Sequence, residues 1–222
     1  MIYIGIATYS GEIHHSTVGG LFNVAYGMGK SRTPVCLDVI PHDCFIDHAR
    51  ELMAHRFLSI PDATDMVMID ADVGFGYDDF ELLMKVDADV VSGVYPYKED
   101  EEHYPVTTQQ PIEKRGRLVT MVYGPAGFMR IKRKVLEKLA LTVPKYTDNE
   151  HGLLSEFFPI TKGHVRHGED AGFCRLATAA GFKVVAVEGM ELQHTGSKTW
   201  RGKWDATKKG AAFRTVKMEV AA

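Results

Sequence analysis

Short apolar runs separated by longer amphipathic segments dominate the first 95 residues. Runs rich in β-branched residues predict buried strands at residues 2–7, 33–40, 65–70 and 89–94. Apolar residues at helical spacing predict a helix at residues 19–28 and two further helices, capped by Asp43 and Asp78. The helix after Asp43 would bury one apolar face, formed by Phe45, Ile46, Ala49, Leu52, Met53 and Phe57. Strands that are apolar throughout and alternate with helices predict a parallel sheet covered on both faces.

The pattern is less regular from residue 96 onward. It predicts strands at 117–123, 127–131 and 182–187, and helices at 132–139 and 169–180. Residues 143–163 show no clear period, and a stretch of that length is typical of a binding loop or lid. We therefore expect one α/β domain with a mostly parallel central sheet flanked by helices. Its parts would be a nucleotide-binding half at 1–95, an acceptor and catalytic half with a small mixed region at 96–197, and a basic tail at 198–222.

Composition narrows the class of protein. The chain has 222 residues, 45% hydrophobic and 25% charged, as in an ordinary globular domain. With 26 Lys and Arg against 29 Asp and Glu, the formal net charge of -3 gives no overall reason to bind nucleic acid or an anionic membrane. Three cysteines without a C-x-x-C spacing, Cys36, Cys44 and Cys174, indicate buried free thiols in a reducing compartment. With no basic leader and no apolar run near the roughly 20 residues of a membrane span, we expect a cytoplasmic protein.

Two carboxylates, Asp70 and Asp72, stand where the predicted strand at 65–70 ends. Ligands of parallel α/β sheets bind at the carboxyl ends of the strands. Carboxylate oxygens suit Mg²⁺ or Mn²⁺, which usually bridge a few carboxylates to the phosphates of a substrate. An isolated Asp-x-Asp is a weak signal, because many strands end in an aspartate that forms a turn or caps a helix. The position at the end of a buried strand nevertheless favours a metal site.

Gly168-Glu169-Asp170 opens a predicted helix and has two interpretations. First-turn acids are common because they complement the helix dipole, and the motif alone favours that interpretation. The alternative is a carboxylate general base near the metal, which takes the proton of an acceptor hydroxyl. His194 follows a short strand, and neutral imidazole is a common ligand for ions such as Mn²⁺. A zinc site built from histidines is disfavoured, because no cysteine partners them and their spacings match no common zinc pattern.

Three common nucleotide-binding or hydrolase motifs are missing from the sequence. Gly29-Lys30-Ser31 resembles the end of a P-loop, but Val24 stands where the first glycine of that loop belongs. No G-x-G-x-x-G follows the first strand, which disfavours a dinucleotide-binding dehydrogenase. The sequence contains no G-x-S-x-G motif, the nucleophile turn of α/β-hydrolases, which disfavours a serine hydrolase.

Five motifs, in order, resemble the GT-A glycosyltransferases, in particular the large inverting family and its short bacterial and phage members. They are the opening strand and turn (4–9), the Asp-x-Asp strand (66–72), the strand after the next helix (89–95), a glycine-containing turn and strand (124–129) and the x-Glu-Asp motif (168–174). His194 falls where many relatives place a histidine that reaches the metal. The turn Ala7-Thr8-Tyr9-Ser10 departs from the family, whose members often have a proline and an asparagine there. The resemblance covers residues 1 to about 200 and implies a Rossmann-like GT-A fold.

The same resemblance implies a metal-dependent transfer of a hexose from a UDP- or GDP-sugar to an acceptor hydroxyl. Asp72, with Asp70 directly or through water, would hold Mn²⁺ or Mg²⁺, and His194 would add a ligand. Asp170 would be the general base of an inverting reaction, and Glu169 would position the acceptor. Donor contacts are expected from Thr8, Tyr9, Arg50, Asp70, Ala71, Lys198 and Arg201, with Tyr9 stacked on the nucleobase. For Arg50, an exposed helical arginine is an equally good interpretation.

The segment from Lys198 to Lys217 is rich in Lys and Arg, with Asp205 its only acid. It has three interpretations: a solvated end, a lid in which Lys198, Trp200 and Arg201 close over the donor diphosphate, or a contact to a polyanionic acceptor such as DNA with modified bases. A glycan or a small molecule are the other candidate acceptors. Rival functions are a retaining glycosyltransferase, a nucleotidyltransferase and an inactive sugar- or nucleotide-binding module. The loop at 10–20 contains no arginine, which counts against a nucleotidyltransferase.

Overall fold

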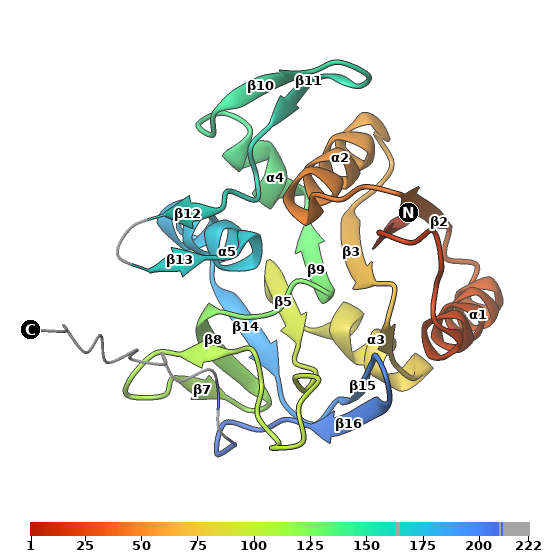
Figure 1. Cartoon of the computed structure of the whole chain (residues 1–222), viewed down its shortest axis with the longest axis vertical. Helices are drawn as coiled ribbons and strands as arrows, with labels where there is room; N and C mark the ends of the chain where they lie inside the picture. The colour runs from red at the N-terminus through yellow and green to blue at the C-terminus, as the bar shows by residue number, and fades with distance from the viewer. Residues whose placement is uncertain (163–164, 209, 211–222) are drawn as a thin grey trace, which may run out of the picture.

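The computed structural model describes residues 1–162, 165–208 and 210, and within them a mixed sheet of nine strands runs through the molecule (Figure 1). In spatial order the strands are β2 (Val35–Pro41), β1 (Ile2–Thr8), β3 (Asp65–Asp70), β9 (Phe128–Lys132), β5 (Val90–Gly93), β14 (Val184–Val187), β8 (Leu118–Tyr123) and β6 (Thr107–Thr108), with β7 (Lys114–Arg115) also paired to β8. All of them point the same way except β9 and β8, which pair antiparallel with their neighbours. The predicted mostly parallel sheet is therefore confirmed, with β9 inserted between two parallel strands.

Helices cover both faces of this sheet (Figure 1). One face carries α1 (His15–Ser31) and α3 (Tyr77–Lys85), and the other carries α2 (Ile46–Ser59), α4 (Arg133–Leu139) and α5 (Glu169–Ala179). Alternate residues of a strand enter opposite cores, so that Tyr3 of β1 lies with the α2 side while Ile4 lies with the α1 side. Both faces of the central strands β1, β3, β5 and β14 are buried, which explains their almost unbroken apolar sequence.

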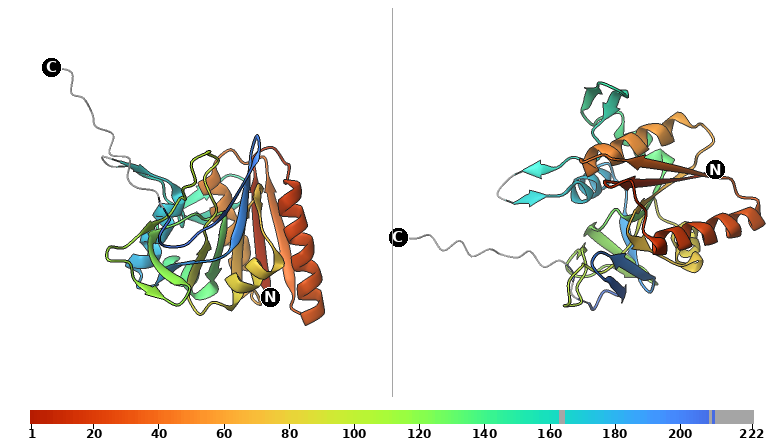
Figure 2. Two further views of the ribbon diagram at one scale, coloured as in Figure 1. Left: turned by 90° about the horizontal axis from the view of Figure 1, so that it is seen from below. Right: turned by 45° about the vertical axis from the view of Figure 1, so that its right-hand side comes forward.

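Three smaller sheets complete the fold. They are β10 (Lys145–Asp148) with β11 (Gly152–Ser155), β12 (Thr161–Lys162) with β13 (Arg166–His167), and β4 (Val73–Gly74) with β15 (Glu191–Thr195) and β16 (Thr199–Lys203). The right-hand view of Figure 2 shows the β10–β11 and β12–β13 hairpins extending from the body of the molecule. The expectation of no regular element at 143–163 was wrong, because three short strands, β10, β11 and β12, lie there. The largely exposed β10 and β11 lack the apolar pattern of a buried strand.

Several predicted boundaries also differ from the structure. Helix α1 begins at His15 rather than at residue 19, because the side chain of His14 accepts a hydrogen bond from the Ser16 amide and caps it. Asp43 does not cap α2: its Oδ1 accepts from the Phe45 amide at 2.9 Å, and Phe45 itself is the N-cap. Phe45 is 66% exposed and Ile46 is 38% exposed, so neither belongs to the buried helix face.

Asp78 likewise is not the cap of α3. It lies inside the first turn, and Gly76 is the N-cap. The neighbouring Asp79 accepts from the Gly76 amide at 3.0 Å and thereby satisfies a free backbone donor at the start of the helix. The remaining predicted strands and helices are present, with ends shifted by a few residues.

The cysteine prediction is confirmed in one respect and wrong in another. All three cysteines are free thiols, but only Cys174 is buried, whereas Cys36 is partly exposed and Cys44 is exposed. In the part of the chain that is described, no helix has both the length and the apolar character needed to cross a bilayer.

Candidate active site

Asp70 is the last residue of β3, and its side chain is held by the protein on both oxygens. Its Oδ1 accepts from Arg50 Nη2 at 3.0 Å, and its Oδ2 accepts from the Tyr95 hydroxyl at 3.2 Å. The backbone amide of Asp70 donates to the Gly127 carbonyl at 2.9 Å. Asp70 is therefore a carboxylate held by a protein donor on each oxygen, at the carboxyl end of the sheet.

Arg50 of α2 joins this carboxylate to the other predicted acid motif. The guanidinium is 4% exposed and forms an ion pair with Glu169 through Nη1 as well as the one with Asp70. The two carboxylates raise the pKa of Arg50, although burial alone would lower it. The exposed helical arginine considered from the sequence is therefore wrong. Arg50 instead ties α2, β3 and α5 together, and its observed partners are carboxylates.

Asp72 lies two residues further on and faces two nitrogen groups. Lys98 Nζ donates to Asp72 Oδ2, and His194 Nε2 lies 3.7 Å from Asp72 Oδ1. The strand pairing brings His194 there, because β15 aligns His194 with Val73 of β4 and the Thr195 amide donates to the Asp72 carbonyl at 2.9 Å.

The tautomer of His194 follows from its other contact. Nδ1 lies 2.9 Å from the Pro96 carbonyl, which can only accept, so Nδ1 carries the proton and donates. In the neutral ring, Nε2 then presents its lone pair toward Asp72. Burial lowers the pKa of His194 and favours that neutral form. A carboxylate oxygen and an imidazole nitrogen thus converge on one point.

This pair of donors suits a divalent ion that also binds phosphate. Among the described residues, no three His, Cys, Asp or Glu side chains gather closely enough to share one ion. The structure brings Asp72 and His194 together, while the oxygens of Asp70 turn to Arg50 and Tyr95. Mg²⁺ and Mn²⁺ usually take one or two protein ligands and complete their coordination with water and substrate phosphates, so two donors fit. His164, one of the histidines weighed for zinc, lies outside the described residues.

Asp170 stands in the first turn of α5, beside this cluster. Burial raises the pKa of its carboxyl to about 6, and the negative charge of Glu169 adds to the shift. The Arg50 charge and the Ala171 amide, which donates to Asp170 Oδ1 at 2.7 Å, act in the opposite direction. A carboxylate whose pKa lies near neutral pH has the property that a general base requires.

The ends of β1 and β3 border an open pocket of about 560 Å³. Thr8, Tyr9, Ala71 and Asp72 line it together, so the structure brings these predicted donor residues to one place. Tyr9 is 77% exposed, which leaves its ring available for stacking. His14 and His15, considered from the sequence only for the disfavoured zinc site, line the same pocket, and their ring centroids lie 4.1 Å apart.

Lys198 and Arg201 are placed differently from the other predicted donor residues. Lys198 forms an ion pair with Asp100 and lies over the Trp200 ring, and Arg201 is exposed on β16 opposite Gln193. Neither side chain lines the 560 Å³ pocket. Residues 209 and 211–222, which hold the rest of the basic tail, lie outside the described residues.

Three further residues of the site were not singled out from the sequence: Tyr95, Lys98 and Gly127. Tyr95 follows β5, and Gly127 belongs to the glycine-containing turn noted above, but nothing local relates either of them to Asp70. A Cβ atom at Gly127 would lie 2.1 Å from Asp70 Oδ2 and 2.4 Å from the Tyr95 hydroxyl. Only glycine therefore lets the β9 backbone approach the Asp70 carboxylate so closely.

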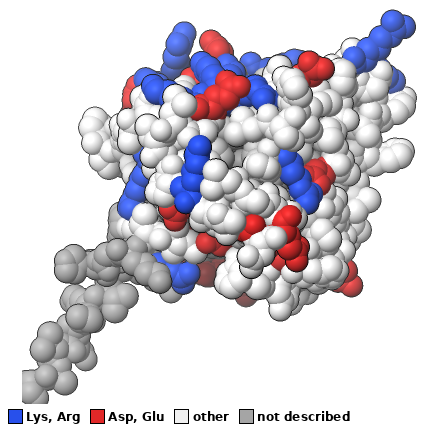
Figure 3. Space-filling view, turned by 90° about the horizontal axis from the view of Figure 1, so that it is seen from above, with Lys and Arg blue, Asp and Glu red and all other residues white. Residues whose placement is uncertain are grey.

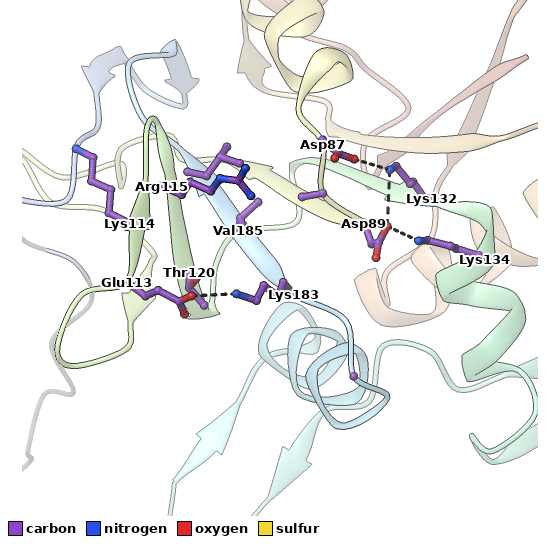
Figure 4. A pocket seen from close by; sticks show the side chains of 13 residues that line it. Asp87, Asp89, Glu113, Lys114, Arg115, Thr120, Lys132, Lys134, Lys183 and Val185 are labelled. Atoms are coloured by element: carbon purple, nitrogen blue, oxygen red, sulfur yellow. Dashed lines mark hydrogen bonds and ion pairs between the residues drawn. The ribbon is translucent and has the colours of Figure 1, made fainter.

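A second cavity, of about 440 Å³, lies at the opposite edge of the sheet, where β5 and β14 begin (Figure 4). Most of its charged side chains pair with one another: Lys134 with Asp89 at 2.7 Å, and Lys183 with Glu113 at 2.9 Å. Within the described residues, the predicted site residues all lie elsewhere. The pocket at the carboxyl ends of the strands is therefore the candidate active site.

Comparisons with known proteins bear on the fold. No protein-family model matches the chain, and no curated protein matches it. Among solved structures, A197 from STIV is similar with a TM-score of 0.57 and 18% sequence identity, over 88% of this chain and 86% of that one. GalNAc-T7, solved with UDP, GalNAc and Mn2+, is similar with a TM-score of 0.51 and 9% identity, over 84% of this chain but only 42% of its own.

At these identities the similarity concerns the fold and not the activity. This chain therefore has the GT-A fold of nucleotide-sugar glycosyltransferases.

Proposed function

We propose that this protein transfers a hexose from a nucleoside-diphosphate sugar to an acceptor hydroxyl, with Mn²⁺ or Mg²⁺ held by Asp72 and His194. The observation that carries the proposal is the convergence of these two donors beside the pocket that Tyr9 and Ala71 line. The similarity in fold to a protein solved with UDP, GalNAc and Mn2+ supports the choice of ligands. When bound, the metal would supply charge neutralisation for the diphosphate leaving group.

Each protein group has a task in this proposal. Arg50 holds Asp70 and Glu169 in fixed positions, so that the acidic edge of the site stays rigid. The Pro96 carbonyl orients the His194 ring through Nδ1. Thr8, Tyr9 and Ala71 contact the nucleoside, with the exposed Tyr9 ring available to stack on the base.

Asp170 is the general base of the proposed reaction. It accepts the proton of the acceptor hydroxyl while the acceptor oxygen bonds to the anomeric carbon of the sugar. The bond between that carbon and the diphosphate breaks, and the nucleoside diphosphate leaves with the electron pair. Attack from the side opposite the leaving group inverts the anomeric centre, so the configuration of the product distinguishes this reaction from a retaining one.

Thermal shifts with UDP, GDP, CMP and dTDP and their sugar conjugates, with and without Mn²⁺, test the donor site. One nucleotide should stabilise the protein in a metal-dependent way, by about 2.7 kcal/mol at a hundredfold excess over Kd. Asp72→Ala should abolish the shift, whereas the control Asp62→Ala, an exposed acid remote from the site, should keep it. No shift with any nucleotide would refute the proposal and favour an inactive binding module. Release of pyrophosphate instead of nucleoside diphosphate would identify a nucleotidyltransferase.

The acceptor is proposed only as a hydroxyl compound: a glycan, a small molecule or modified DNA. The described part of the basic segment is partly neutralised, because Lys198 pairs with Asp100 and Lys208 with Glu102. On the face shown in Figure 3, Lys and Arg side chains lie interspersed with Asp and Glu. Binding to duplex DNA that weakens steeply with salt would support modified DNA as the acceptor. If the protein does not bind duplex DNA, that acceptor is excluded.

A further inference from the structure

The ammonium group of Lys98 contacts Asp72, the carboxylate proposed to hold the metal. Its Nζ donates to Asp72 Oδ2, while Asp72 Oδ1 faces His194 Nε2. The side chains of Lys98 and Asp72 are 36% and 37% exposed, so the pair lies at the open mouth of the site. An ammonium group and a divalent ion would share this one carboxylate, the ammonium at Oδ2 and the metal at the Oδ1 that faces His194, and the two positive charges oppose each other there.

The position of Lys98 is fixed by the segment that carries it, residues 96–106. Two contacts attach this segment to the β15–β16 ribbon: Pro96 accepts from His194, and Asp100 pairs with Lys198 in the turn between the two strands. Beyond the ribbon, Glu102 pairs with Lys208. The ribbon that presents His194 therefore also positions Lys98.

The stem of the Lys98 side chain rests on the same ribbon. A Cβ atom at Gly196 would lie 3.1 Å from Lys98 Cδ and 3.4 Å from the Trp200 ring. Gly196 thus leaves the room in which the aliphatic stem crosses the turn between β15 and β16 toward Asp72. The contact between Lys98 and Asp72 depends on this close approach.

We propose that Lys98 competes with the divalent metal for Asp72 and moves to the donor diphosphate when the metal binds. A metal ion that arrives alone has to break the ion pair and leaves an ammonium group beside a double positive charge. A diphosphate that arrives with the metal gives the ammonium a new anionic partner. Metal and nucleotide consequently strengthen each other's binding, and Lys98 carries part of that coupling. This inference rests on the proposed function.

The test uses the full chain and two methionine variants. Lys98→Met keeps the stem over Gly196 and removes only the charge, and Lys203→Met removes a charge from an exposed position on the same ribbon. Electron paramagnetic resonance measures free Mn²⁺ during a titration without nucleotide. Calorimetry then measures UDP and GDP binding without Mn²⁺ and at saturating Mn²⁺, and the ratio of the two affinities is the coupling factor. Circular dichroism and thermal melting establish that each variant is folded.

Lys98→Met should bind Mn²⁺ alone about two- to fivefold more tightly, the range expected when an exposed ion pair no longer has to be broken. The factor by which the nucleotide strengthens Mn²⁺ binding should fall by at least as much. Lys203→Met should match the wild type in both respects. The proposal is overturned if Lys98→Met binds Mn²⁺ no more tightly than the wild type does. It is also overturned if Lys203→Met shows the same gain in Mn²⁺ affinity, or if Mn²⁺ binds to neither the wild type nor Lys98→Met. If Mn²⁺ binding changes as expected but no nucleotide binds, the proposed function fails. The competition between Lys98 and the metal for Asp72 then stands, and the movement of Lys98 to a diphosphate is refuted.

Discussion

Asp170 offers a prediction in which stability and activity change in opposite directions. Burial makes its carboxyl a weaker acid in the folded protein, with a pKa of about 6 against 3.8 for the free side chain. At 1.36 kcal/mol per pKa unit, ionised Asp170 costs the folded state about 3 kcal/mol near pH 7. Asp170→Asn removes that cost, and its Oδ1 can still accept the hydrogen bond from the Ala171 amide.

The pH dependence of this effect has a definite sign. The folded protein binds the Asp170 proton more tightly than the unfolded chain, so the group destabilises the fold only when it is ionised. The wild type should therefore lose stability relative to Asp170→Asn as the pH rises from about 4 to about 6, and the difference should be constant above that. Urea unfolding at several pH values measures it, with Asp62→Asn, at an exposed position, as the matched control.

Turnover should show the opposite behaviour. As the proposed general base, Asp170 has to be ionised, so kcat/KM of the wild type should rise with pH up to about 6 and then level off. Asp170→Asn should reduce turnover by roughly 10²- to 10⁴-fold. The reasoning is refuted if the variant is no more stable than the wild type at pH 7, or if the stability difference does not change with pH. Near-normal turnover in a stabilised variant would place the base elsewhere.

Three further changes probe the residues that hold the site. Arg50→Met leaves the Asp70 and Glu169 carboxylates without their shared cation and should cost about 3 kcal/mol of unfolding free energy in urea denaturation; full stability would mean that solvent already screens them. Gly127→Ala drives a methyl group into the Asp70 carboxylate and should cost about 1–3 kcal/mol of unfolding free energy in urea denaturation. Full stability would show that the carboxylate moves aside at no cost. Tyr146→Phe removes the 2.6 Å hydrogen bond from the Tyr146 hydroxyl to the buried Glu51 of α2 and should cost about 1–3 kcal/mol of unfolding free energy, measured by thermal and urea unfolding. Unchanged stability would mean that water replaces the hydroxyl.

Local sequence was sufficient wherever burial on both sides imposes a single pattern. The strands around Ile4, Val67 and Val91 are apolar throughout because helices cover both faces of the sheet, and they were predicted within a few residues. The β10–β11 hairpin was missed for the converse reason. Its strands are mostly exposed, and it is held by a contact to distant Glu51, which receives a hydrogen bond from Tyr146.

Helix starts were the least predictable part of the fold. An aspartate before a helical pattern is compatible with several caps, and the hydrogen bond finally made depends on neighbours outside the helix. Asp43 illustrates this: its second oxygen lies 2.5 Å from His48 Nδ1, which draws the side chain away from a capping position at the start of α2. Phe45 therefore occupies the N-cap position of α2, although its side chain makes no capping hydrogen bond.

The sequence by itself determined the alternation of strands and helices in the first half, the position of Asp70 and Asp72 at a strand end, and the placement of Asp170 in the first turn of a helix. These features depend on residues close together in the chain. Only the tertiary structure decided that Arg50 is buried between Asp70 and Glu169, and that the β15–β16 ribbon brings His194 and Lys98 to Asp72. The physical reason is that the charge state and partners of a side chain depend on burial and on groups distant in sequence, which only the folded chain brings within a few ångströms.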